Sequence, residues 1–168
     1  WFRTRVGAHR AEQPGPGVPI TILDGGVLLD YDELRERPDL LALNEQPTVA
    51  NPVTAHGTIL AAIAGAPVNG VGTVGVYPRS ALRAYTLAGF DDSSLIAGLD
   101  AVTADGPSVV NFSIGGPGFS QALYEAVLRA VDRGSIVVAS AGNSASGTSP
   151  DFFPADYPHV LTVGSTAR

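Results

Sequence analysis

The sequence predicts an α/β protein with three layers, in which a mostly parallel sheet carries helices on both faces. Short apolar runs alternate along the chain with stretches of helical spacing, the order expected of strand–helix–strand units. The predicted strands are almost continuously apolar, as in the Ile-Val-Val-Ala of residues 136–139. Strands of this kind are typical of parallel sheets that are covered on both faces.

Each element follows from its own local pattern. The apolar runs predict strands at 18–23, 80–86, 108–114, 135–141 and 160–163. Apolar residues at helical spacing predict helices at 56–64, 93–104 and 121–131. Thr54 and either Ser93 or Ser94 are the expected N-caps of the first two helices. Gly134 is the expected stop of the third helix.

One domain is expected over residues 18–168, preceded by an arm of residues 1–17 that is polar and rich in Pro and Gly. Residues 28–43 and 66–76 are expected to be loops. Pro38 limits any helix in the first loop, and glycine and valine dominate the second.

Composition excludes several classes of protein. Of the 168 residues, 45% are hydrophobic and 15% are charged, which is incompatible with a disordered chain. The net charge of −6 without a basic cluster argues against nucleic-acid binding, and no apolar stretch is long enough to span a membrane. There is no Cys, hence no disulfide. There is also no Met, so we expect a processed chain or a part of a longer one.

Polar side chains stand at the ends of three predicted elements. Asp24 follows an apolar strand, Asn143 follows another, and His56 begins a helix. Parallel strands bring their carboxyl ends to one edge of a sheet, so we expect these groups to converge. A carboxylate, an imidazole and an amide are three of the four parts of serine-type acyl transfer. Taken singly, Asp24 also fits a turn aspartate and His56 a helix-end histidine.

Five segments, in order, resemble the successive signatures of the subtilisin-like serine proteases. They are Asp24–Gly26, Ala55–Thr58, Val110–Gly116, Ala139–Asn143 and Phe153–Gly164. The resemblance implies a subtilisin-like fold and endopeptidase activity through a Ser-His-Asp triad. In that triad Asp24 would orient the histidine and His56 would act as general base and then general acid. Asn143 would donate its side-chain amide to the oxyanion.

The resemblance also implies a peptide-binding edge. Ser113, Ile114 and Gly115 match the strand to which an extended substrate adds by backbone hydrogen bonds. Ser140, Ala141 and Gly142 would wall the pocket for the side chain that precedes the cleaved bond. Either Phe152 or Phe153 would form the floor of that pocket.

A structural calcium site is a further implication. Asp39 and the side chain of Asn69 would bind the ion together with the carbonyl oxygens of Pro67, Val71 and Thr73. Oxygen donors in a glycine-rich loop suit calcium; the alternative is a loop without metal. No cofactor is expected to be required for catalysis. The G-x-G-x-x-G pattern of residues 70–75 follows a helix rather than a strand, which argues against a dinucleotide site.

The family's nucleophilic serine has no convincing counterpart. It belongs to a Gly-Thr-Ser-Met-Ala motif that opens a buried helix well beyond the oxyanion asparagine. Gly147-Thr148-Ser149 matches three letters of the motif, but Pro150 and the residues after it do not begin a helix, so a turn is expected. Two other departures are Gly25, where the family has Ser or Thr, and Ile59, where it has a second histidine.

We therefore expect a serine endopeptidase of bacterial, secreted type whose 168 residues are inactive by themselves. The expected partners are an extended peptide or protein substrate and the remaining C-terminal part of the same domain. One alternative is a non-catalytic peptide-binding module that has lost the nucleophile. Another is a cleaved protease that retains its C-terminal piece.

Overall fold

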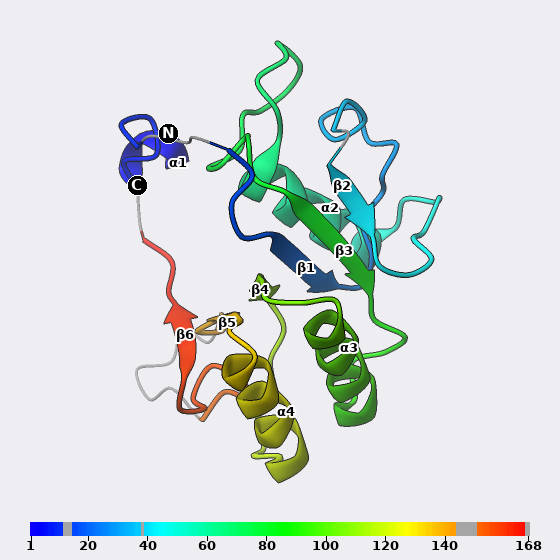
Figure 1. The fold of residues 1–168 in the computed structure, drawn as a ribbon, viewed down its shortest axis with the longest axis vertical. Coiled ribbons are helices and arrows are strands. Elements are labelled where there is room, and N and C mark those ends of the chain that lie inside the picture. Colours follow the sequence, from blue (N-terminus) through cyan, green and yellow to red (C-terminus); the bar gives the residue numbers. More distant parts are fainter. Residues whose placement is uncertain (12–14, 38, 144–150, 167–168) are drawn as a thin grey trace. The chain divides into compact units, whose positions relative to one another are not determined.

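The structure is a computed structural model that describes residues 1–11, 15–37, 39–143 and 151–166. The chain forms two compact units, Trp1–Thr86 and Leu87–Arg168. Each unit combines three parallel strands with two helices (Figure 1).

The sheet of the first unit is formed by three strands in the order β2-β3-β1. Their bounds are β1 Ile20–Asp24, β2 Leu40–Ala42 and β3 Leu82–Thr86. In register, Leu82 of β3 lies opposite Ile20 of β1 on one side and Leu40 of β2 on the other. Strand β2 falls in a segment that was expected to be a loop. Its three residues are half-buried or exposed and carry too little pattern to predict a strand.

Two helices belong to this unit, the short α1 (Phe2–Arg5) and the long α2 (Pro52–Gly65). Helix α2 packs against β1 and lies behind the three strands in Figure 1. Small residues of α2 allow this close packing, because Ala61 and Ala62 are buried in the core. The other buried residues of this core are Ile22, Val27, Leu34, Ala66 and Ala84.

Helix α2 begins earlier than the sequence predicted. Its N-cap is Asn51, whose side-chain oxygen accepts hydrogen bonds from the backbone amides of Val53 and Thr54. The Thr54 hydroxyl in turn accepts from the Asn51 amide at 2.9 Å, which completes a capping box. The prediction of Thr54 as the cap was therefore wrong. Pro52 fits the first helical turn because its missing N–H would have no partner there.

The second unit contains strands β4 (Val109–Phe112), β5 (Ile136–Ser140) and β6 (Val160–Val163), in the order β4-β5-β6. Helices α3 (Asp92–Ala104) and α4 (Gln121–Asp132) pack against each other, as Figure 1 shows. Arg129 of α4 donates to Asp100 of α3 at 2.8 Å. Gly134, at φ +88°, follows α4 as predicted.

The cap of α3 also differs from the prediction. Asp91 is the N-cap, and its carboxylate accepts from the backbone amide of Ser94 at 3.1 Å. The hydroxyls of Ser93 and Ser94 donate to the same carboxylate. The expected cap, Ser93 or Ser94, was wrong because the preceding acid offers two acceptor oxygens and a charge that the helix N-terminus favours.

The strand pairs of both units are parallel, and β6 has the predicted bounds. Within the described ranges, no helix is long and apolar enough to cross a membrane.

The hydrogen bonds to Asp91 give a prediction about pH. The bonds from Ser93 and Ser94 lower the pKa of Asp91 from 3.8 to about 2. Because the pKa is depressed in the folded state, the stabilisation by this cap is complete above pH 3.8 and is lost as the pH falls towards 2. Carboxyl-detected NMR titration of the protein checks the value. An Asp91 carboxyl that titrates near 3.8 would contradict it.

Candidate active site

Asp24 and His56, which are 32 residues apart, are in direct contact. Asp24 is the last residue of β1 and is 2% exposed. His56 lies in the second turn of α2, and its Nδ1 is 3.1 Å from Oδ1 and 2.9 Å from Oδ2 of Asp24. The His56 side chain is 52% exposed. A buried carboxylate therefore holds an imidazole that solvent or a ligand can reach.

This geometry selects the tautomer of the neutral histidine ring. An Nδ1–H that is bound by a carboxylate leaves the ring lone pair on Nε2, the form that acts as a general base. Once Nε2 has taken a proton, the same carboxylate stabilises the imidazolium. The amide of Gly25 donates to Asp24 Oδ1 at 2.8 Å, so the carboxylate keeps its orientation without the hydroxyl that the family usually has at position 25.

Gly57 allows helix α2 to approach the turn after β1, and Gly26 allows the turn itself to pass close to Pro47. A Cβ at Gly57 would collide with the carbonyl oxygen of Gly26 and lie 3.2 Å from the Cβ of Asp24. Gly26 has φ +115°, and a Cβ there would lie 2.6 Å from the ring of Pro47. The Thr58 hydroxyl adds a hydrogen bond from the amide of Leu28 at 2.9 Å. The sequence shows these glycines, but only the structure shows that they meet.

Substitution of Gly57 by Ala tests this close approach. Ala would favour the helix by about 1 kcal/mol through its higher helix propensity. Its methyl group would, however, collide with a backbone carbonyl, which cannot move away by a side-chain rotation. We expect a net loss of about 2 kcal/mol in the free energy of unfolding, measured by chemical denaturation. The matched control is Gly164→Ala, where a Cβ meets nothing within 4 Å. Equal stabilities of the two variants would contradict the packing described.

The second unit carries the predicted oxyanion and substrate-binding residues. Asn143 lies three residues beyond β5 and is exposed. Strands β4 and β5 are parallel neighbours with Phe112 opposite Ala139. The segments at their carboxyl ends, 113–115 and 140–142, therefore lie at the same end of the sheet. Ser113 exchanges side-chain hydrogen bonds with Asn111 at 3.0 and 3.2 Å.

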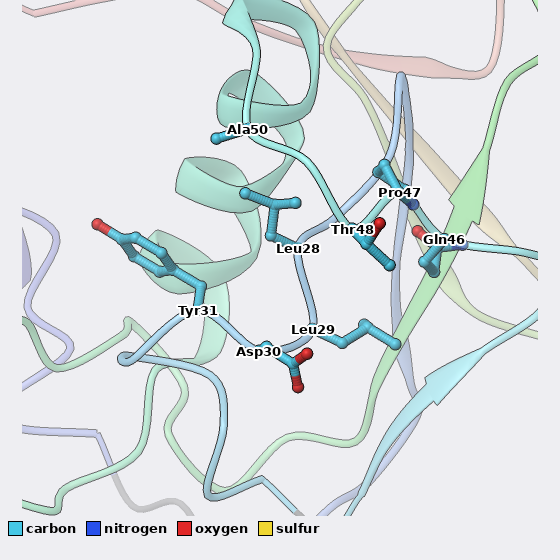
Figure 2. Close-up of a pocket in the computed structure, with 8 residues that line it drawn as sticks. All are labelled: Leu28, Leu29, Asp30, Tyr31, Gln46, Pro47, Thr48 and Ala50. Carbon is cyan, nitrogen blue, oxygen red and sulfur yellow. The ribbon is translucent and has the colours of Figure 1, made fainter.

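Each unit contains a cavity, but only the one in the second unit borders predicted site residues. In the second unit, residues 114–118 border a cavity of about 170 Å³ together with Phe90, Asp92, Leu95, Leu123 and Phe153. In the first unit, a larger cavity of about 360 Å³ lies between residues 28–31 and 46–50. Figure 2 shows that these two segments run past each other beside α2. Neither Asp24 nor His56 lines the larger cavity.

The predicted calcium ligands are bound to protein groups. Asp39 accepts from Arg37 Nη2 at 3.2 and 3.3 Å. Asn69 Oδ1 accepts from the amide of Val71 at 3.1 Å, and its Nδ2 donates to Glu36 at 3.1 Å. Among the residues described, no three His, Cys, Asp or Glu side chains form a group that could hold a metal ion. The Asp39 carboxylate and the Asn69 side-chain oxygen are thus both engaged by protein donors.

Two further positions that the sequence singled out are Ser149 and Ile59. Ser149, with the Gly-Thr-Ser match around it, lies outside the described residues. Ile59, in place of the family's second histidine, is 54% exposed on α2.

Comparison with known proteins identifies the family. Residues 15–168 match the model of the subtilase family. The chain belongs to the subtilase family.

Two curated relatives show how far the similarity extends. Subtilisin BL of Lederbergia lenta is 34% identical over 99% of this chain, which spans 63% of that relative. The alkaline protease of Alkalihalobacillus alcalophilus is 33% identical over 99% of this chain. The match covers 44% of the length of that protease. This subtilase chain thus spans 44–63% of the length of these two curated relatives.

A solved structure confirms the predicted fold class. The subtilisin-like protease Apa1 of Pseudoalteromonas sp. AS-11 superposes with a TM-score of 0.83 and 27% identity, over 96% of this chain and 39% of Apa1. Fervidolysin of Fervidobacterium pennivorans superposes with a TM-score of 0.73 and 25% identity. This match covers 93% of this chain and 25% of the fervidolysin chain.

Proposed function

We propose that this chain supplies the acid, the base and the oxyanion donor of a subtilisin-like serine endopeptidase. The observation that carries the proposal is the buried Asp24 carboxylate at 2.9 Å from Nδ1 of a half-exposed His56. A carboxylate bound to an exposed imidazole in this way is typical of a histidine that works as a base in acyl transfer. Membership of the subtilase family supports the same function.

In this mechanism Nε2 of His56 takes the proton from the attacking serine hydroxyl and later gives it to the leaving amine. Asp24 holds the ring and stabilises the imidazolium between these steps. The side-chain amide of Asn143 donates to the oxygen that becomes negative in the tetrahedral intermediate. The attacking serine is supplied from outside residues 1–168, so these residues by themselves do not hydrolyse peptides.

The substrate is an extended peptide. It pairs through its backbone with the segment Ser113–Gly115, and the side chain that precedes the cleaved bond lies against Ser140–Gly142. From the resemblance to the subtilisin-like proteases we infer that the protease acts outside the cell that makes it. The remainder of the catalytic domain is the partner that completes the site.

A peptide-binding module without catalysis is the second candidate. Gly25 favours it, because the family's hydroxyl beside the catalytic aspartate is missing. The amide of Gly25 occupies one oxygen of the same carboxylate, which supports an intact Asp24–His56 pair and argues for the protease.

Labelling with a fluorophosphonate probe and peptide hydrolysis test the proposal. We expect the full-length protein to be labelled at a serine outside residues 1–168 and to hydrolyse peptides, whereas the isolated 168 residues do neither. Asp24→Asn should lower kcat by about 10⁴-fold, and Asn143→Ala by about 10²–10³-fold.

The matched control is His9→Ala, which removes another exposed histidine and should leave kcat unchanged. Labelling of Ser149 in the isolated chain would overturn the assignment of the nucleophile. A full-length protein that binds peptides without hydrolysing them would establish the binding module instead.

A further inference from the structure

The ring of Phe152 lies against two glycines that follow neighbouring strands. A Cβ at Gly115 would overlap the ring, with Cδ1 and Cζ at 2.9 Å, and a Cβ at Gly142 would lie 3.4 Å from three ring atoms. Phe112 of β4 and Ala139 of β5 are register partners. Gly115 lies three residues after Phe112, and Gly142 lies three residues after Ala139. The absence of a side chain at Gly115 makes room for this ring, whereas a Cβ at Gly142 would be in ordinary van der Waals contact with it.

Backbone hydrogen bonds hold Phe152 at this place. Its amide donates to the Asp156 carboxylate at 2.6 Å, and its carbonyl oxygen accepts from the Asp156 amide at 3.0 Å. The next residue, Phe153, exchanges two backbone hydrogen bonds with Gly116, at 2.9 and 3.0 Å. Phe153 also stacks edge-on against Phe119 with ring centroids 5.5 Å apart. The position of the ring is thus set by the hydrogen bonds of Phe152 itself and of the residue that follows it.

We propose that Phe152 fills the inner part of the pocket for the substrate side chain that precedes the cleaved bond. This inference rests on the proposed function, in which 113–115 and 140–142 border that side chain. A substrate Phe or Leu needs the volume that the ring occupies, whereas Gly or Ala does not. The enzyme therefore prefers Gly or Ala at this substrate position. Discrimination by a filled apolar pocket is typically about 10–200-fold.

A pair of otherwise identical tetrapeptide anilides, with Ala or Phe before the cleaved bond, tests the preference in the full-length protein. We expect wild-type kcat/KM to be at least about 10-fold higher for Ala. Phe152→Gly should raise kcat/KM for the Phe substrate by about 10-fold or more and change the Ala substrate little. Phe119→Gly is the matched control, because Phe119 is 58% exposed and belongs to the neighbouring aromatic cluster. It should leave the ratio unchanged.

Binding of the product acids, acetylated tetrapeptides that end in Ala or Phe, gives a readout without turnover. Calorimetry should show that Phe152→Gly strengthens binding of the Phe-ended peptide and leaves the Ala-ended peptide unchanged. Equal preference in wild type and Phe152→Gly, in either assay, would overturn the role of Phe152. Absence of hydrolysis and probe labelling together would instead overturn the proposed function, while the binding comparison would still decide on Phe152.

A second, independent observation concerns the loop between α2 and β3. The guanidinium of Arg37 is buried, with 2% of the side chain exposed. It donates to the carbonyl oxygens of Gly65, Pro78 and Ser80 and to the carboxylate of Asp39. Gly65 ends α2, and the other two carbonyls precede β3. Carbonyl and carboxylate oxygens are also the donors that a calcium ion takes in proteins.

Two further carboxylates fasten the same loop. Glu33 accepts from the amide of Thr73 at 2.8 Å, and Glu36 accepts from Asn69 at 3.1 Å. Glu33, Glu36 and Arg37 therefore join the loop by hydrogen bonds, and Arg37 is a buried cation among them. A divalent ion beside this guanidinium would meet a like charge and would have to displace Arg37 from Asp39.

We infer that Arg37 takes the place of calcium as the cation that holds this loop. Arg37→Met should lower the midpoint of thermal unfolding of the full-length protein by about 10 °C, since three carbonyls and one carboxylate lose their partner. The matched control Arg35→Met removes an exposed ion pair with Asp32 and should shift the midpoint by less than about 2 °C.

Calcium itself provides the decisive comparison. Exchange of calcium for a chelator should shift the unfolding midpoint of wild type and of Asp39→Asn equally, because no ion is bound through Asp39. This comparison also stands if Arg37→Met does not fold. A calcium-dependent rise in the wild-type midpoint that Asp39→Asn or Asn69→Ser abolishes would overturn the inference.

Discussion

The close approach of helix α2 to the turn after β1 is the constraint on which the candidate active site depends. Asp24 can bind Nδ1 of His56 only because Gly57 brings the helix backbone against the carbonyl of Gly26. This contact has no side chain that could relax, so the distance between the strand end and the helix is set by backbone atoms. Such a rigid separation suits a carboxylate–imidazole pair, whose hydrogen bonds tolerate little displacement.

The second unit uses the same device for a different purpose. Gly115 and Gly142 follow registered residues of β4 and β5. The ring of Phe152 occupies the space left at Gly115 and is in contact with Gly142. In a pocket bordered by backbone, the largest neighbouring side chain sets the size of any ligand that enters. The acid–base pair therefore belongs to the first unit, whereas the proposed selectivity rests on one aromatic ring of the second.

The types and order of most elements could be predicted from the sequence because apolar spacing reflects which side of an element is buried. The bounds of β6 and the glycine stop after α4 were predicted in this way. Two helix caps were predicted wrongly, since several capping residues stand together and only geometry selects Asn51 and Asp91. Strand β2 was missed because its residues are too few and too exposed to show a pattern.

The sequence by itself determined the fold class and the family and pointed to Asp24 and His56 as partners, because these follow from local spacing and from motifs that keep their order. Only the tertiary structure decided that Asp24 lies 2.9 Å from His56, that Arg37 is buried among carbonyl oxygens, and that Phe152 lies over two glycines. Each of these contacts joins residues distant in the chain. Their distances are set by how helices and strands pack, which residue patterns along a single segment do not encode.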